Sequence, residues 1–89
     1  DTDSTLSAVG GGAAGSWMWA NLGPKIAAGD GKPGFMIRLQ QKDLRLAREL
    51  FEEMGMDAPG TALTYSLFTK AVEQGLGAEG NQALFRLWE

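Results

Sequence analysis

The strongest constraint on the fold is the spacing of apolar residues between Ile37 and Met54. At about 100° per residue, one half of a helical wheel over this stretch is apolar and the other half carries charged and amide side chains. The apolar half holds Ile37, Leu39, Leu44, Leu46, Ala47, Leu50, Phe51 and Met54. This pattern predicts one long amphipathic helix lying on a core, and no stretch alternates with period two for long enough to be a strand.

Start and stop signals predict two shorter helices ahead of the long one. Residues 1–9 carry Ser, Thr and Asp caps before their apolar residues and allow two helical turns at most. Ser16 is a suitable N-cap for a helix over residues 17–28, in which Pro24 predicts a kink or a second helix start. The turn-forming stretch 29–34 then separates this helix from the long one.

Two more helices are predicted after Gly55, which ends the long helix. Asp57 provides a cap for a helix over residues 59–75, whose first residue is a proline. A last short helix over residues 82–88 is expected to pack back onto the earlier ones. We therefore predict one all-α domain of about five helices.

The segment Gly10–Gly15 matches the G-x-G-x-x-G pattern that cradles a pyrophosphate. A dinucleotide fingerprint follows a buried strand, whereas the residues before Gly10 favour a helix, so a connection that lets two helices approach closely is the better interpretation. Trp17 and Trp19 could stack on a base or a sugar, but no cationic groove accompanies them. We expect Trp17 to join the core and Trp19 to face a neighbouring domain or subunit.

The composition excludes several kinds of chemistry. With no Cys and no His, the chain cannot hold a Ser-His-Asp or Cys-His catalytic set or a thiolate metal site, and we expect no metal ion. The net charge of -3 and the absence of a Lys/Arg run argue against nucleic acid as a partner. No apolar stretch approaches the roughly 20 residues of a membrane span, so we expect a cytoplasmic protein. The start at Asp1 without Met suggests excision from a longer chain.

Asp43 stands out on the long helix because its wheel position, at about 240°, lies inside the apolar half. Burying an unpaired carboxylate costs several kcal/mol, so Asp43 needs a partner, a capping role or an opening onto a site. If the helix begins only at Leu39 or Gln40, Asp43 falls in its first turn, where the macrodipole favours a carboxylate. The residues leave both interpretations open. Lys42, at the edge of the polar face, can reach toward the same place.

Short motifs run along almost the whole chain: Gly11–Trp17, Asn21–Lys25, Pro33–Phe35, Gln41–Leu44, Leu46–Ala47 and Pro59–Ala62. In order and spacing they resemble the C-terminal domain of the β-hydroxyacid dehydrogenases, the family of 3-hydroxyisobutyrate dehydrogenase and tartronate semialdehyde reductase (2-hydroxy-3-oxopropionate reductase). The most specific feature is Pro-Gly-Phe followed by Lys-Asp-Leu. The chain departs from the family at Gly31, where an aromatic residue is usual, and ahead of the last helix, where an acidic cap is missing.

The resemblance implies an NAD(P)-dependent oxidoreductase of two domains, in which residues 1–89 form the 6-phosphogluconate-dehydrogenase-like helical domain that closes the cleft. A Rossmann domain, absent from this chain, would bind most of the NAD or NADP. The catalytic Lys would lie upstream on a long interdomain helix, so no catalytic residue is expected here. By the matched motif, Phe35 would lie against the nicotinamide end of the cofactor, and Lys42 and Asp43 would line the same cleft.

The implied reaction is reversible hydride transfer between NAD(P) and a small β-hydroxyacid or its semialdehyde, with tartronate semialdehyde favoured over 3-hydroxyisobutyrate. The implied partners are the Rossmann domain, the substrate and further copies of the protein in a homodimer or tetramer. The isolated chain is expected to be inactive. The alternative is a non-enzymatic helical interaction module whose Trp17, Trp19 and Trp88 bind a partner protein.

Overall fold

The computed structural model describes all residues from Asp1 to Glu89 and is helical throughout, as the sequence predicted. The only extended pairing is an isolated antiparallel bridge between Met36 and Gly80. The elements in chain order are α1 (Thr2–Gly10), α2 (Trp17–Ala27), α3 (Ile37–Glu53), α4 (Pro59–Glu73) and the 3-10 helix η1 (Asn81–Trp88). No helix of the structure is both long enough and apolar enough to span a membrane.

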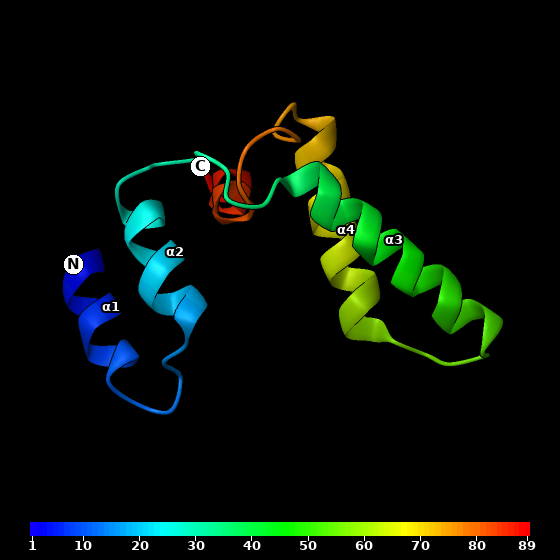
Figure 1. Cartoon of the computed structure of the whole chain (residues 1–89), viewed down its shortest axis with the longest axis horizontal. Helices are drawn as coiled ribbons and strands as arrows, with labels where there is room; N and C mark the ends of the chain where they lie inside the picture. Colours follow the sequence, from blue (N-terminus) through cyan, green and yellow to red (C-terminus); the bar gives the residue numbers. More distant parts are fainter.

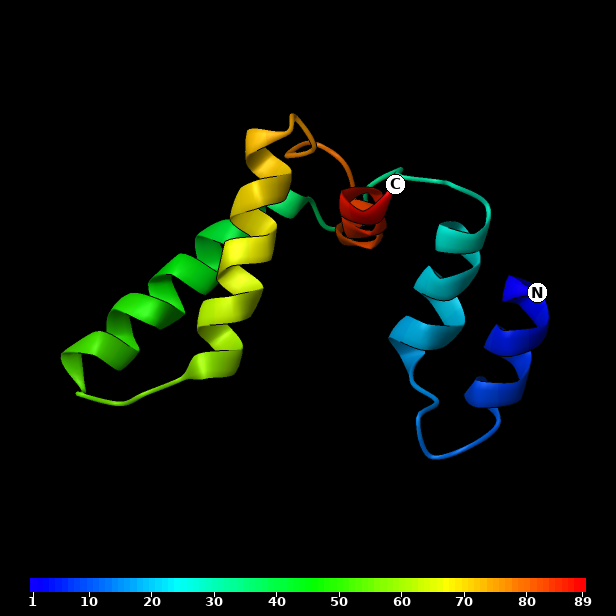
Figure 2. The same ribbon diagram turned by 180° about the vertical axis from the view of Figure 1, so that it is seen from behind.

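The helices form an arch with two arms. Helices α1 and α2 make one antiparallel pair, α3 and α4 make the other, and η1 lies between the two pairs (Figures 1 and 2). Helix η1 contacts α2, α3 and α4, whereas the two pairs make no direct helix-to-helix contact with each other. The molecule accordingly extends over 44 × 31 × 21 Å. The prediction that the last helix packs onto the earlier ones is confirmed.

Most helix ends follow the predicted signals. The Ser16 hydroxyl accepts a hydrogen bond from the Trp19 amide at 2.9 Å and so caps α2. Gly55 follows α3 with φ +66°, a conformation that suits glycine alone. The prediction for Asp57 was wrong, because the N-cap of α4 is Ala58 and no side chain caps it. Helix α2 runs through Pro24 as one helix, so the predicted second helix start is absent although Pro24 lacks the backbone donor of a regular helix.

Helices α1 and α2 approach closely at glycines. Gly23 is buried, and a Cβ added there would lie 2.6 Å from Cδ2 of Leu6. The indole nitrogen of Trp19 donates a hydrogen bond to the Leu6 carbonyl at 2.8 Å. The predicted roles of the two tryptophans were therefore reversed, because Trp19 joins α1 to α2 whereas the Trp17 side chain is 71% exposed. A Cβ on Gly15 would also collide with the backbone of the preceding loop, which supports the close-approach interpretation of the glycine run.

The hydrophobic core is small and lies where α3, α4 and η1 meet. Its buried members are Ile37, Phe68, Ala71 and Ala83, and the partly buried residues packed against them are Leu44, Val72, Leu76, Leu84 and Leu87. Many other large apolar side chains remain exposed. Because burial of apolar surface is the main favourable term in folding, this chain gains little of it by itself.

Candidate functional site

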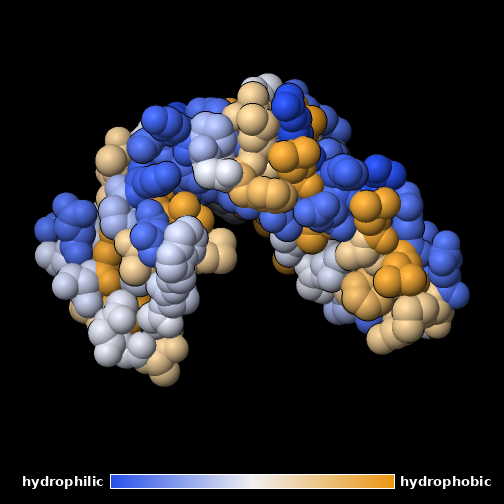
Figure 3. All heavy atoms as spheres, in the orientation of Figure 1, coloured by the Kyte–Doolittle hydropathy of each residue, from blue (hydrophilic) through white to orange (hydrophobic).

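The apolar half of α3 is covered on one side only. Ile37 is fully buried and Leu44 packs against the core, so this side of the helix faces α4 and η1. The remaining apolar side chains form an uncovered row, which we call the α3 strip. It consists of Leu39, Leu46, Leu50 and Met54, which are 41%, 46%, 54% and 59% exposed. In the space-filling view, hydrophobic residues gather on the arm that α3 and α4 form (Figure 3).

Asp43 lies in the α3 strip, and Lys42 lies beside it. Both side chains are exposed, and neither makes an ion pair or a side-chain hydrogen bond. Helix α3 begins at Ile37, which places Asp43 in the second turn and leaves no acidic residue in the first. The local explanation for this carboxylate, stabilisation of the first turn, is therefore excluded. A carboxylate and an ammonium group remain available at a surface that is otherwise apolar.

Phe35 stands just before α3 and is 45% exposed. Its carbonyl accepts a hydrogen bond from the Asn81 amide at 2.9 Å, so the backbone is anchored to η1 while the ring stays accessible. The first amides of α3 are anchored in the same way: the Ile37 amide donates to the Glu79 carbonyl at 2.9 Å, and the Arg38 amide to the Gly77 carbonyl at 2.9 Å. The start of α3 and the Phe35 backbone are thus hydrogen-bonded to the same segment, residues 77–81.

A groove of about 890 Å³ runs between the two arms of the arch, visible as the hollow in Figure 3. Its walls are mostly apolar and come from α1, α2, α4 and η1, with Gln40 contributed by α3. Phe35, Lys42 and Asp43 do not line it. Gln40, however, lies three residues before Asp43 on the same side of α3, so the groove and the α3 strip meet within one helical turn.

The polar end of this groove contains an amide pair that the sequence did not reveal. The Asn81 side-chain nitrogen donates to Oε1 of Gln40 at 3.2 Å, and the buried Asn81 Oδ1 accepts no hydrogen bond. Nothing in the sequence marks these two residues as neighbours, because 41 positions separate them. A buried acceptor without a donor costs about 1–3 kcal/mol.

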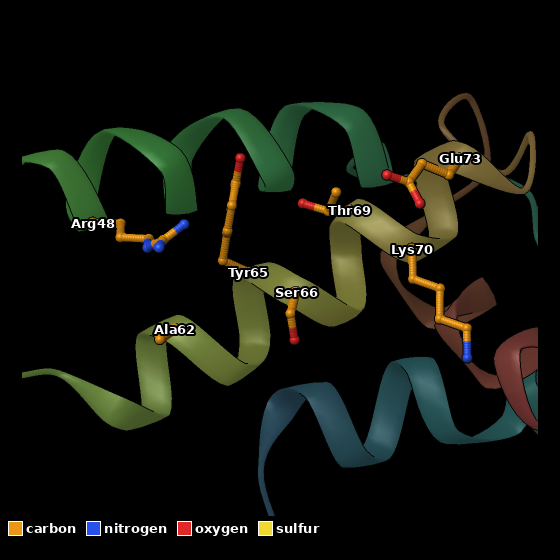
Figure 4. A pocket seen from close by; sticks show the side chains of 7 residues that line it. All are labelled: Arg48, Ala62, Tyr65, Ser66, Thr69, Lys70 and Glu73. Carbon is orange, nitrogen blue, oxygen red and sulfur yellow. The ribbon is translucent and has the colours of Figure 1, made fainter.

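Two smaller grooves lie along α3 and α4. The one drawn in Figure 4 has a volume of about 390 Å³ and is lined mainly by α4. Tyr65 points from α4 toward α3, where the Arg48 guanidinium lies 5.3 Å from the ring centroid. Arg48 also pairs with Glu52 at 3.8 Å on the exposed face, as helical spacing predicts. The contact between Tyr65 and Arg48 links α4 to α3, whereas the Arg48–Glu52 pair lies within α3, and none of the predicted site residues takes part in either.

The fold and the site define a helical domain whose apolar surface is only partly covered. Residues 1–88 match the family described as NAD-binding of NADP-dependent 3-hydroxyisobutyrate dehydrogenase. The chain belongs to this 3-hydroxyisobutyrate dehydrogenase-like family, and the resemblance stated from the motifs is confirmed.

The relatives of this chain are longer proteins, and the chain matches one part of each. It is 38% identical over 88 residues to an uncharacterized oxidoreductase of Bacillus subtilis, a match that covers 99% of this chain and 31% of that protein. It is 38% identical over 72 residues to 2-(hydroxymethyl)glutarate dehydrogenase of Eubacterium barkeri, covering 81% of this chain and 24% of that protein. The chain thus spans about a third or less of the length of these relatives.

A solved structure shows the same fold. The crystal structure of 3-hydroxyisobutyrate dehydrogenase from Salmonella typhimurium superimposes with a TM-score of 0.90 at 26% sequence identity. The match covers 97% of this chain and 30% of that one. The expectation of an all-α domain from this class of oxidoreductases is therefore confirmed.

Proposed function

We propose that this chain is the helical, cleft-closing domain of a two-domain enzyme that transfers hydride between NAD(P) and a small β-hydroxyacid or its semialdehyde. The observation that supports the proposal is the α3 strip, an uncovered apolar surface with Asp43 among its side chains and Lys42 beside them. The names of the relatives agree with a small hydroxyacid or an aldehyde acid as substrate: 2-(hydroxymethyl)glutarate carries its hydroxyl group β to a carboxyl group, and other relatives are an L-threonate dehydrogenase and a glyoxylate/succinic semialdehyde reductase. Within the class, tartronate semialdehyde is the substrate we favour over 3-hydroxyisobutyrate.

The residues of this chain suit one wall of a dinucleotide site. Phe35 offers an accessible aromatic ring to the nicotinamide end, and Lys42 offers an ammonium group to an anionic or polar group. The Asp43 carboxylate accepts a hydrogen bond from a neighbouring donor group of the site and so orients that group. The glycine run Gly10–Gly15 connects two helices and does not follow a strand, so it does not replace the phosphate-binding turn.

When bound, the dinucleotide supplies the hydride chemistry, and the protein binds, orients and excludes water. In this scheme Phe35 and the α3 strip exclude water from one side of the cleft. Lys42 and Asp43 fix the polar groups that border it. The proton-donating Lys belongs to the upstream part of the complete protein, so the isolated chain binds no substrate productively and turns none over.

The other surfaces of the chain are assigned to the rest of the complete protein. A Rossmann domain holds most of the cofactor and decides between NAD and NADP through its own acidic or basic residues. The apolar groove between the arms receives the interdomain helix, and further copies complete a homodimer or tetramer in the cytoplasm. The share of the relatives' length that this chain leaves unmatched supports a second domain.

The test is Lys42→Ala in the complete protein, with Lys70→Ala as the matched control. Lys70 is an exposed lysine on α4, remote in sequence from the α3 strip. We expect kcat/KM to fall at least tenfold for Lys42→Ala and to stay within about twofold for Lys70→Ala, at unchanged thermal stability. Equal turnover of both variants would remove Lys42 from the site.

The alternative function, a non-enzymatic interaction module, draws its support from two exposed indoles. The side chains of Trp17 and Trp88 are 71% and 70% exposed, and aromatic residues are enriched at protein interfaces. Trp19 does not belong to such a surface, since its indole nitrogen is bonded to Leu6. A thermal-shift assay of the complete protein with NAD and NADP separates the two functions, because an interaction module gains no stability from either dinucleotide.

A further inference from the structure

The loop of residues 29–34 leads to Phe35 and is stabilised mainly by hydrogen bonds from residues outside the loop. Gly29, Gly31, Pro33 and Gly34 give it turn chemistry but no apolar side chain to bury. The only hydrogen bond between its own residues that involves a side chain runs from the Lys32 amide to Oδ1 of Asp30. Four successive carbonyl groups of this loop, those of residues 29–32, instead accept hydrogen bonds from residues 80–86.

Gln82 makes two of these four bonds. Its side-chain nitrogen donates to the Asp30 carbonyl at 3.1 Å and to the Lys32 carbonyl at 2.8 Å, so both amide hydrogens are used. Gln82 is the only buried polar or charged residue of the chain, with 5% exposure. A backbone bond from the Gly80 amide to the Gly31 carbonyl, at 2.8 Å, lies between the two Gln82 bonds.

Gln82 is packed closely against Gly80 on one side, while another side lines the apolar groove. Its amide group packs on Gly80, where an added Cβ would collide with it. A Cβ on Gly31 would lie 2.5 Å from Oε1 of Glu79, so the loop also lies close to the neighbouring ion pair of Glu79 and Arg86. The two glycines therefore let the loop and the start of η1 approach closely enough for one glutamine to bridge them.

We infer that Gln82 is a positioning residue for Phe35, acting through the loop that the glutamine holds. Phe35 follows Lys32 by three residues, and its own carbonyl accepts a hydrogen bond at 2.9 Å from the backbone amide of Asn81, the residue just before Gln82. Removing the two Gln82 donors loosens the loop at Asp30 and Lys32, while the other two loop bonds and the Asn81 anchor of Phe35 remain. This inference rests on the proposed function, in which the Phe35 ring contacts the nicotinamide.

The test uses Gln82→Met in the complete protein, which keeps the length and volume of the side chain and removes both donors. Gln74→Met is the control, since Gln74 is an exposed glutamine at the end of α4. The first measurement is hydrogen exchange of the peptide covering residues 29–36, which does not depend on any activity. Exchange is expected to accelerate in Gln82→Met and to remain unchanged in the control.

The second measurement separates positioning from a general loss of structure. We expect kcat/KM for the dinucleotide-dependent reaction to fall about ten- to a hundredfold in Gln82→Met, because small misplacements of a positioning group have costs of this size. Phe35→Ala should fall similarly, and the double variant should be no slower than Phe35→Ala alone. A merely structural Gln82 would instead give additive losses.

The outcomes distinguish a wrong role for Gln82 from a wrong assignment of the site. Unchanged exchange in Gln82→Met, or additive losses in the double variant, overturns the role of Gln82 and leaves the proposed function intact. Accelerated exchange with full activity in Gln82→Met, Phe35→Ala and Lys42→Ala alike overturns the site assignment itself. If Gln82→Met does not fold, Gln82→Asn serves in its place, because the shorter amide cannot span both carbonyls.

Discussion

The division of α3 into a buried side and an uncovered strip can be tested with one pair of substitutions. Ile37 is fully buried, whereas Leu50 in the α3 strip is 54% exposed. Replacing a buried Ile by Ala costs about 2–5 kcal/mol, and the small core around Ile37 lets its neighbours relax, so we expect about 3 kcal/mol for Ile37→Ala. Leu50→Ala removes a side chain that is only half buried, so we expect about 1 kcal/mol.

These values are measurable by urea unfolding of the 89-residue chain, followed by circular dichroism. At roughly 0.05 kcal/mol per residue the chain has about 4 kcal/mol of stability, so Ile37→Ala leaves little of it. With a urea m-value of about 1 kcal/mol/M, the midpoint falls by about 3 M for Ile37→Ala and about 1 M for Leu50→Ala.

The complete protein provides the second half of the test. If another part of the protein covers the α3 strip, Leu50 becomes a buried residue there, and Leu50→Ala should cost about 2–5 kcal/mol, as Ile37→Ala does. Equal costs for the two variants in the isolated chain would refute the division of α3. A cost for Leu50→Ala that does not rise in the complete protein would show that nothing covers the strip.

The remaining predictions concern stability and are measured as shifts in the melting temperature of the isolated chain. Trp19→Phe should cost about 0.5–1.5 kcal/mol, since the hydrogen bond to the Leu6 carbonyl is lost; no shift would mean that the bond does not hold α1 to α2. Ser16→Ala should cost about 1 kcal/mol through loss of the α2 cap, and an unchanged melt would contradict the capping geometry. Gly55→Ala should cost roughly 1–2 kcal/mol because φ is +66° there. Gly60→Ala, in the first turn of α4 with open space around it, should instead stabilise by up to about 1 kcal/mol, and the opposite ranking of these two glycine variants would refute the backbone assignment.

The sequence predicted where the helices lie more successfully than it predicted which helix faces are covered by neighbours. The periodicity that begins at Ile37 located α3 within a residue at each end, because both amphipathic spacing and Gly55 are local signals. A helical wheel records polarity but does not say how many neighbours cover the apolar half, so the α3 strip became visible only in three dimensions. The exchange of roles between Trp17 and Trp19 has the same origin, since the deciding hydrogen bond reaches a carbonyl 13 residues away.

The residues of the candidate site were also only partly predictable from the sequence. Lys42 and Asp43 were predicted from a wheel position and a family motif, and the start of α3 at Ile37 excluded the capping explanation for Asp43. Gln82 could not be found in this way, because its two acceptors lie 50 and 52 positions earlier in the chain. A single glutamine in a short apolar helix carries no pattern of its own. Its importance follows from burial and from the number of carbonyls that it satisfies.

Because η1 lies between the two arms, it determines where residues can be inserted into the chain without disturbing the fold. The connection between α3 and α4 lies at the far tip of one arm (Figure 1), and it bridges two helices that are already packed together. Extra residues inserted there lengthen a free tip and cost little beyond loop entropy. An insertion ahead of η1, by contrast, displaces the only helix that touches both arms, so natural length variation and engineered fusions are expected to concentrate at the tip and to be absent around residue 80.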